Sequence, residues 1–254
     1  MADWFIVYLL AMTRCYGFFA MLPQIGEVEM PYGAKLALIA TITPFLAAPA
    51  VLHTHLDHTS ITLLLLVGKE LLLGMFLGFL VSLPLRLPQL VGDLIDNQRG
   101  AAVTAQYNPG TQQEDSILGQ LLTLCVVVYF FSEGGFDRFI GILSASFALQ
   151  SVNSFEFGAF GDGRNFYQIA LLVTTNYLQL FAILCTPLML VMLCADLSLG
   201  IASKFAQSLN VFSLSQSVKA VIAIGMLISL HPRLMAMYLR FFDDTVGMLF
   251  GAAL

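Results

Sequence analysis

The polar residues that could do chemistry in this sequence gather in one stretch, RLPQLVGDLIDNQRGAAVTAQYNPG, at residues 86–110. The carboxylates of Asp93 and Asp96 lie three residues apart in it, and the Arg99 side chain follows. On a helix, Asp96 and Arg99 would be close enough to form a local ion pair. Acids placed in this way could relay protons, line a water-filled path or pair with the charges of another protein.

The same stretch has the pattern of an amphipathic helix. Apolar residues at intervals of three and four predict one buried face, formed by Leu87, Leu90, Val91, Leu94 and Ile95. Pro88 suits the first turn of such a helix, and Asn108-Pro109 predicts its end. The sequence therefore predicts a helix that starts near residue 87 and stops before Pro109.

The polar face of this predicted helix permits three interpretations. It could be solvated between two apolar segments, it could line an aqueous conduit or seat a partner subunit, or Asp93 or Asp96 could relay protons. Gly92, Asp96 and Gly100 are spaced four residues apart, so they form one ridge on this polar face. Because the two glycines have no side chain, this ridge lets another backbone approach the acid closely.

A second polar feature interrupts the apolar run LLLVGKELLLGMFLGFLV at residues 64–81. Lys69 and Glu70 are adjacent, so on a helix their side chains point about 100° apart, and we expect each to need a partner elsewhere. Glu70, Gly74 and Gly78 share one ridge, and Gly74 to Gly78 is a small-xxx-small pair of the kind that packs membrane helices. The ridge favours a tight helix–helix interface beside a buried acid.

Other constellations that could do chemistry are weak. HTHLDH at residues 53–58 fits neither a zinc-protease nor a zinc-finger spacing, which favours a polar loop. The four cysteines lie singly in apolar runs and are expected to be small buried residues. No nucleophile elbow, phosphate-binding loop or dinucleotide fingerprint is present. We expect no catalytic residue, no cofactor and no metal.

Composition places these features in a membrane protein. Of the 254 residues, 58% are hydrophobic and only 11% charged, whereas soluble domains have about a quarter charged residues. The net charge of −5 argues against binding nucleic acid. The start of the chain has no basic region or cleavage site of a signal peptide, so we expect one mature domain, 1–254.

The long apolar runs are interrupted by charges or prolines. The runs cover residues 4–22, 34–52, 61–83, 117–131, 166–195 and 211–230, with weaker ones at 139–149 and 234–254. Arg14, Lys69, Glu70 and Lys219 lie inside them. Because charges are costly in lipid, such residues normally face protein or water. We expect these helices to be buried against other subunits.

Near the C-terminus, KFAQSLNVFSLSQSVKAVIAIGMLISL at residues 204–230 resembles a segment of the flagellar FliR family and its injectisome relatives. That segment has the form Pro-x-Leu-Asn-Val-Phe, with a lysine about nine residues after the asparagine. Asn210, Phe212 and Lys219 match it, although Gln207 or Ser208 stands where the family has proline.

The polar stretch resembles the same family. GDLIDNQRG is similar to the family's Gly-acid/x-Ile-Asp-x-Gln-x-Gly segment, which a proline follows, here Pro109. Further matching positions, in the family's order along nearly the whole chain, are Arg14, Pro23, Pro31, Glu70, Gly74, Gly78, Ser146, Phe147 and Pro187.

The resemblance implies an all-α integral membrane protein of helical hairpins that assemble into a pseudo-symmetric helical export gate. It implies the non-enzymatic T subunit of type III secretion, of an injectisome more than of a flagellum, in the bacterial inner membrane within the basal body. The implied partners are R-type and S-type subunits, a switch protein with a self-cleaving cytoplasmic domain, a V-type export protein, unfolded secreted polypeptides and membrane lipids.

An alternative is a stand-alone secondary transporter or channel that uses Asp93, Asp96, Glu70 and Lys69 as an ion path. It predicts inverted repeats, which the sequence does not have. The candidates for a subunit interface or a conduit are Arg14, Lys69, Glu70, Gly74, Gly78, Gly92, Asp93, Asp96, Gln98, Arg99, Gly100, Pro109, Asn210, Phe212 and Lys219.

Overall fold

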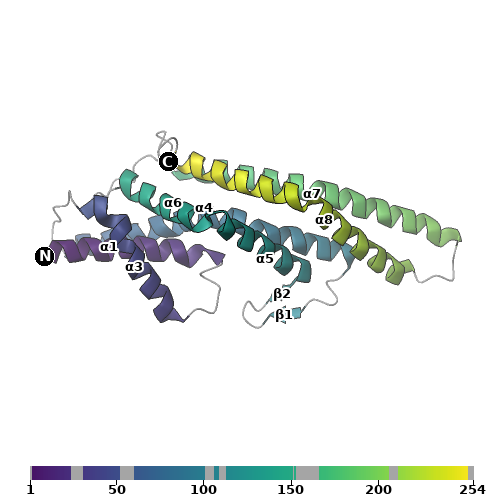
Figure 1. The fold of residues 1–254 in the computed structure, drawn as a ribbon, viewed down its shortest axis with the longest axis horizontal. Coiled ribbons are helices and arrows are strands. Elements are labelled where there is room, and N and C mark those ends of the chain that lie inside the picture. The colour runs from purple at the N-terminus through teal and green to yellow at the C-terminus, as the bar shows by residue number, and fades with distance from the viewer. Residues whose placement is uncertain are drawn as a thin grey trace. The chain divides into compact units, whose positions relative to one another are not determined.

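Helices make up nearly all of the residues that the structure, a computed structural model, describes, which confirms the all-α fold class (Figure 1). The structure describes residues 2–23, 31–51, 60–100, 106–108, 113–150, 152, 166–205 and 211–250. The helices are α1 (Ala2–Met21), α3 (Tyr32–Val51), α4 (Ser60–Arg99), α5 (Ile117–Ser132), α6 (Gly135–Leu149), α7 (Phe166–Phe205) and α8 (Val211–Phe250).

In the part of the chain that the structure describes, the exception to the helical pattern is a short ribbon between α4 and α5. Its strands β1 (Gln106–Asn108) and β2 (Gln113–Asp115) pair antiparallel, with Tyr107 opposite Glu114. The predicted helix end near Pro109 is therefore wrong. The helix stops at Arg99 because Gly100 adopts the left-handed conformation, with φ of 78°, that commonly terminates helices.

The predicted helix start at Pro88 is also wrong, because α4 runs unbroken through Pro84 and Pro88. Likewise α7 continues through Pro187. Each proline removes one backbone hydrogen bond of the helix, but packing against neighbouring helices and nearby hydroxyl groups can offset the loss.

Within the described residues, three helices are long and apolar enough to cross a membrane: Trp4–Met21, Ile61–Arg99 and Tyr167–Phe205. Helices α5 and α6 would add a fourth span if the bent pair is counted as one. The two longer spans have 39 residues each, about twice the length that a bilayer requires. These lengths confirm the membrane class.

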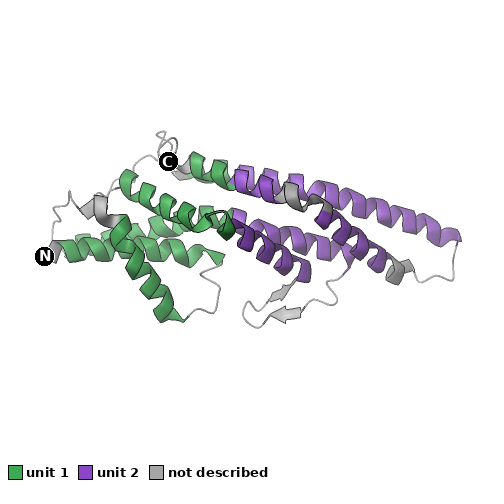
Figure 2. Cartoon of the chain, viewed as in Figure 1, with its two compact units in different colours: residues 1–83, 131–175, 242–254 green, residues 84–130, 176–241 purple. Residues whose placement is uncertain are grey.

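The chain divides into two compact units (Figure 2). Unit 1 comprises Met1–Leu83, Phe131–Thr175 and Phe242–Leu254, and unit 2 comprises Pro84–Phe130 and Asn176–Phe241. The boundary falls inside four of the helices, α4, α5, α7 and α8. A single domain over residues 1–254 stays a prediction.

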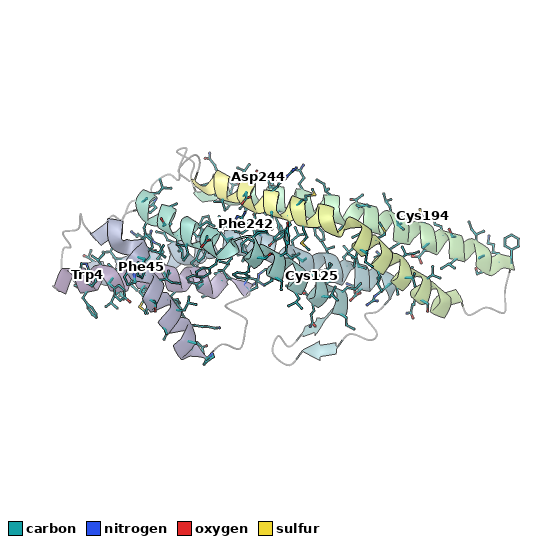
Figure 3. The ribbon with its side chains drawn as sticks, in the orientation of Figure 1. Trp4, Phe45, Cys125, Cys194, Phe242 and Asp244 are labelled. Atoms are coloured by element: carbon teal, nitrogen blue, oxygen red, sulfur yellow. The ribbon has the colours of Figure 1, made fainter. Side chains whose placement is uncertain are left out.

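Phe139 of α6 lies at the centre of the core of unit 1. Its ring packs against Phe18 of α1, Phe131 of α5 and Phe242 of α8, with ring centroids 6.1 to 6.2 Å apart. Phe242 is buried, whereas Phe45 on α3 has 80% of its surface exposed (Figure 3). Helix α3 packs against both α1 and α6. The aromatic cluster therefore fixes α6 between α1 and the end of α8.

Glycines allow α1 and α4 to approach closely in unit 1. A Cβ atom added at Gly74 would collide with the backbone of Arg14, and one added at Gly78 would collide with the backbone of Phe18. From the other helix, a Cβ at Gly17 would lie 2.7 Å from the Leu71 carbonyl oxygen. The predicted ridge thus packs tightly, and the helix that it meets belongs to the same chain.

Substitution of Gly74 by alanine should destabilise the protein by about 1–3 kcal/mol, because the added methyl group overpacks the backbone of α1. Gly68 lies on the same helix with no atom near the corresponding Cβ position. Gly68→Ala should therefore be neutral, or stabilising by up to about 1 kcal/mol through helix propensity. Thermal unfolding of both variants in mild detergent, followed by circular dichroism, measures the difference; equal effects would contradict the tight α1–α4 contact.

Candidate functional site: two clusters of buried polar side chains

Arg14 lies at the centre of the first cluster, in unit 1. Its Nε donates to Glu70 Oε2 of α4 at 2.5 Å. Its two terminal nitrogens donate to the carbonyls of Ser146 and Gln150, both at 3.0 Å. We call Arg14, Lys69, Glu70, Ser146 and Gln150 the Arg14 cluster. One guanidinium thus ties α1 to α4 and to the end of α6.

The end of α6 offers a favourable environment for this positive charge. Ser146 and Gln150 lie at its C-terminus, where the helix dipole attracts cations. The Phe147 ring lies 4.4 Å from the guanidinium carbon, a cation–π distance. Arg14 and Glu70 both have 0% of their surface exposed. The burial is tolerable because the guanidinium is paired with a carboxylate and hydrogen-bonded to backbone as well.

Lys69 departs from the sequence expectation. Its Nζ lies 2.8 Å from Glu70 Oε1, so the two adjacent side chains do form an ion pair, and the prediction that they point apart is wrong. The long lysine side chain curls back to the carboxylate, and Nζ also reaches the Val152 carbonyl at 3.5 Å. The prediction that Glu70 needs a partner from elsewhere is confirmed, since Arg14 supplies it.

Removing one partner of this cluster should be strongly destabilising. Arg14→Met leaves the Glu70 carboxylate buried without its main partner and should cost about 3–5 kcal/mol. Arg138→Met is the matched control, because that arginine is 27% exposed in its ion pair with Asp243 and should cost less than about 1 kcal/mol. Addition of Glu70→Gln to Arg14→Met should recover part of the loss. Unfolding midpoints of these variants in detergent measure the differences. Equal losses of stability for the two arginine substitutions would contradict the central role of Arg14 in the cluster.

The second cluster, in unit 2, joins α4 to the start of α5. Asp93 Oδ1 accepts from the Ser116 hydroxyl at 2.7 Å and from the Gln89 amide at 3.1 Å. Asp96 Oδ2 accepts the backbone N–H of Leu118 at 3.1 Å. Ser116 in turn accepts the N–H of Gly119 at 2.8 Å and so caps α5. We call Asp93, Asp96, Arg99, Gln89 and Ser116 the α5 seat.

Asp93 and Asp96 lie at the start of α5, the positive end of its helix dipole, where negative charge is favourable. Asp96 has 5% of its surface exposed, so the solvated interpretation of the polar face is wrong for this residue. The predicted local pair is confirmed: Arg99 Nε lies 2.7 Å from Asp96 Oδ1. A Cβ at Gly92 would collide with the backbone of Gly119, so the small residue allows the close approach that these bonds require.

Lys219 of α8 contacts two other helices of unit 2. Its Nζ lies 2.5 Å from Asp196 Oδ1 of α7 and donates to the Gln98 carbonyl at 3.0 Å. Lys219 therefore pairs with an acid of a neighbouring helix. The Gln216 side chain donates to the Gly100 carbonyl at 3.3 Å. Two side chains of α8 therefore satisfy carbonyls at the C-terminal end of α4.

Loss of the Asp96 carboxylate should loosen the start of α5 without unfolding the chain. Asp96→Ala removes a helix cap and should cost about 1–2 kcal/mol. Hydrogen exchange at residues 117–120 should become faster, while exchange at residues 142–149 stays unchanged. Asn97→Ala, at an exposed position of the same turn, is the control and should change neither. Unaltered exchange in Asp96→Ala would show that the carboxylate does not seat α5.

The other sequence candidates are only partly placed. Pro109, Asn210 and the HTHLDH stretch lie outside the described residues, and of Phe212 only its position in α8 is given. Within the described ranges, no three histidine, cysteine or acidic side chains gather as a metal site would require. The remaining candidates lie in the Arg14 cluster, on the ridge of Gly74 and Gly78, in the α5 seat, or at contacts with the C-terminal end of α4.

Three contributors escaped the sequence analysis, and a fourth, Ser146, entered it only as a position that resembles the family. Gln150 and Ser146 contribute backbone carbonyls, which no side-chain pattern reveals. Ser116 directly precedes an apolar run, which is a helix-start signal. Asp196 is the single acid in the apolar span Tyr167–Phe205, and this signal could have identified it as a buried partner.

The two clusters have the chemistry of positioning. Each acid is neutralised by a nearby cation or accepts hydrogen bonds from a helix start. Each cation is bound to an acid, and Arg14, Lys69 and Lys219 are bound to carbonyl groups as well. Such networks specify how helices pack, since an alternative packing would leave a buried charge unpaired.

Comparison with known proteins gives a consistent result. Residues 5–245 match the model of the family "Bacterial export proteins, family 1". The chain is 32% identical to "Yop proteins translocation protein T" of Yersinia pestis over 223 residues, 86% of this chain and 83% of that protein. It is 26% identical to "Secretion system apparatus protein SsaT" of Salmonella typhimurium over 93% of this chain and 91% of that protein. It is 25% identical to "Flagellar biosynthetic protein FliR" of Bacillus subtilis over 89% of this chain and 86% of that protein.

Proposed function

Because this chain belongs to the bacterial export proteins, family 1, we propose that it is a structural subunit of the type III protein secretion export gate. It completes a pore complex through which unfolded polypeptides are exported across the inner membrane. Its work is to position helices and seal the assembly, and it catalyses no reaction. The injectisome form is favoured over the flagellar one, since identity is 32% to the Yop translocation protein and 25% to the Bacillus flagellar protein.

The observation that best supports a subunit role is the uncovered surface of α7. Only 33% of an 18-residue apolar window of the span Tyr167–Phe205 is buried within the chain, compared with 50% of such a window of Ile61–Arg99. Its large exposed apolar residues include Leu171, Leu178, Leu190, Leu193, Leu197 and Ile201. Contiguous apolar surface of this extent has to be covered by other subunits or by lipid.

The buried charges support the same proposal over the transporter. Glu70 and Lys69 are paired with each other, and Glu70 also with Arg14. Asp93 and Asp96 accept hydrogen bonds from the start of α5. An ion path requires polar groups that can exchange partners along a route, whereas these acids are engaged in helix packing. The interface candidates then act on assembly chiefly by fixing which helix faces the chain presents.

The partners that follow from this role are R-type and S-type export-gate subunits, with a switch protein that has a self-cleaving cytoplasmic domain and a V-type export protein nearby. We place the complex in the inner membrane, within the basal body of the secretion system. The chain acts there as one export-gate domain, 1–254.

Co-expression with the R-type and S-type subunits of the same operon tests this function. After extraction in mild detergent, native mass spectrometry should show one copy of this chain in a complex with several R and S copies. Gly68→Ala should enter the complex like the native chain, because nothing lies near the added Cβ. Gly74→Ala should enter it less well, because the α1–α4 contact is altered.

A stable monomer or homodimer that ignores co-expressed partners would contradict the export-gate function. In that case ion flux should be measured in liposomes, with Glu70→Gln and Asp96→Asn as variants. Flux that both substitutions abolish would favour the transporter.

A further inference from the structure

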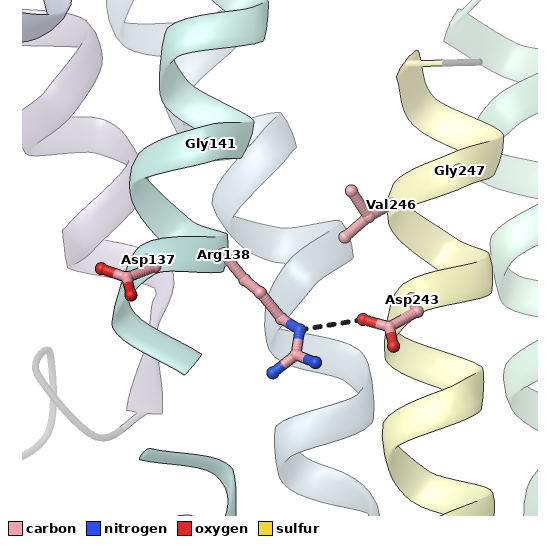
Figure 4. A pocket seen from close by; sticks show the side chains of 6 residues that line it. All are labelled: Asp137, Arg138, Gly141, Asp243, Val246 and Gly247. Atoms are coloured by element: carbon pink, nitrogen blue, oxygen red, sulfur yellow. Dashed lines mark hydrogen bonds and ion pairs between the residues drawn. The ribbon is translucent and has the colours of Figure 1, made fainter. Parts of the chain in front are cut away.

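A surface groove of about 450 Å³ lies between α6 and α8 in unit 1 (Figure 4). Its lining residues are Asp137, Arg138, Gly141, Asp243, Val246 and Gly247. The Arg138 and Asp243 side chains point toward each other across the gap, and Val246 extends toward α6 from the same side (Figure 4). The groove therefore has a charged part and, one helical turn away, a part formed by small and apolar residues.

The walls of the groove are fixed. Phe139 and Phe242, the neighbours of Arg138 and Asp243 in the chain, each have 1% of their surface exposed and pack with ring centroids 6.2 Å apart. This contact holds α6 and α8 at a set spacing. A Cβ atom added at Gly247 would meet nothing within 4 Å, so the hollow in front of this residue is open. Preformed hollows of this volume are typical of sites for small ligands.

The charged part offers both an anion-binding and a cation-binding group. Arg138 Nε donates to Asp243 Oδ1 at 2.9 Å and Nη1 donates to the Glu133 carbonyl at 2.7 Å, while Nη2 has no partner among the described residues. The Asp243 side chain is 56% exposed, and its second oxygen is available to a donor. In Figure 4 the Asp137 carboxylate lies on the far side of α6 from Asp243.

We propose that this groove binds the head group and the first part of an acyl chain of an aminophospholipid such as phosphatidylethanolamine. The phosphate accepts from Arg138 Nη2, the ammonium donates to Asp243, and the chain lies over Gly141, Val246 and Gly247. The charges of the groove match this ligand, since a cation and an acid side by side complement a head group with a phosphate and an ammonium. The site is independent of the export function proposed above.

Head-group chemistry separates this lipid from other phospholipids. The ethanolamine ammonium has three N–H donors for a carboxylate, whereas the choline group has none. A glycerol head group leaves the lipid with a net negative charge and has no ammonium group for the Asp243 carboxylate, which lines the groove. We therefore expect ethanolamine lipids to bind more tightly than choline or glycerol lipids.

The test is a lipid titration of the full-length chain in non-ionic detergent, read by native mass spectrometry. The probes are dioleoyl phosphatidylethanolamine, phosphatidylcholine and phosphatidylglycerol. The ethanolamine lipid should bind at the lowest concentration, and Asp243→Asn should weaken it about tenfold by removing a charge-assisted hydrogen bond. Asp244→Asn is the matched control, because Asp244 is exposed on the same helix and does not line the groove.

A second pair of variants tests the apolar part of the site. Gly247→Leu should fill the groove and abolish the selective binding, whereas Gly225→Leu, also with nothing near its Cβ position on α8, should preserve it. Equal binding of the three lipids, or equal binding by the two leucine variants, would overturn the proposal. If Gly247→Leu instead keeps lipid binding and weakens association with co-expressed subunits, the groove is a protein docking surface and the lipid assignment is wrong.

Discussion

The ion pair between Arg14 and Glu70 is the constraint on which the packing of unit 1 depends. Neither side chain reaches solvent, so each charge must be compensated by groups that the fold brings to it. Glu70 and the carbonyls of Ser146 and Gln150 come from two other helices, so only one arrangement of α1, α4 and α6 satisfies the guanidinium. The apolar contacts around Phe139 could tolerate small shifts, whereas this polar contact could not.

Close helix contacts make these hydrogen bonds possible. Arg14 meets Glu70 where Gly74 brings the backbone of α4 against that of α1, and Asp93 meets Ser116 where Gly92 brings α4 against Gly119 of α5. An aspartate side chain is short, so it cannot reach across a helix pair spaced by large residues. The glycines set the distance between the helices, and the acids then fix their register.

Much of this could be predicted from the sequence. Composition and run lengths gave the membrane class and the helical fold, and four-residue spacing marked the Gly74–Gly78 ridge and the Asp96 ridge. The helix boundaries at Pro88 and Pro109 failed, because local proline rules do not take account of tertiary packing or of the left-handed Gly100. Backbone partners of Arg14 could not be foreseen, since any residue has a carbonyl group.

The failed expectation at Lys69 explains why buried charges are hard to place from spacing. Directions around a helix describe where a Cβ atom points, and a side chain with four methylene groups can reach well beyond that direction. Lys69 therefore binds the carboxylate of its own neighbour, which Arg14 also binds. Two cations on one acid would be unfavourable in isolation, but carbonyl groups at the end of α6 and at Val152 share the positive charge. The cluster is consequently stable only when α6 is in place, and the charges that seemed to define an ion path are what positions that helix.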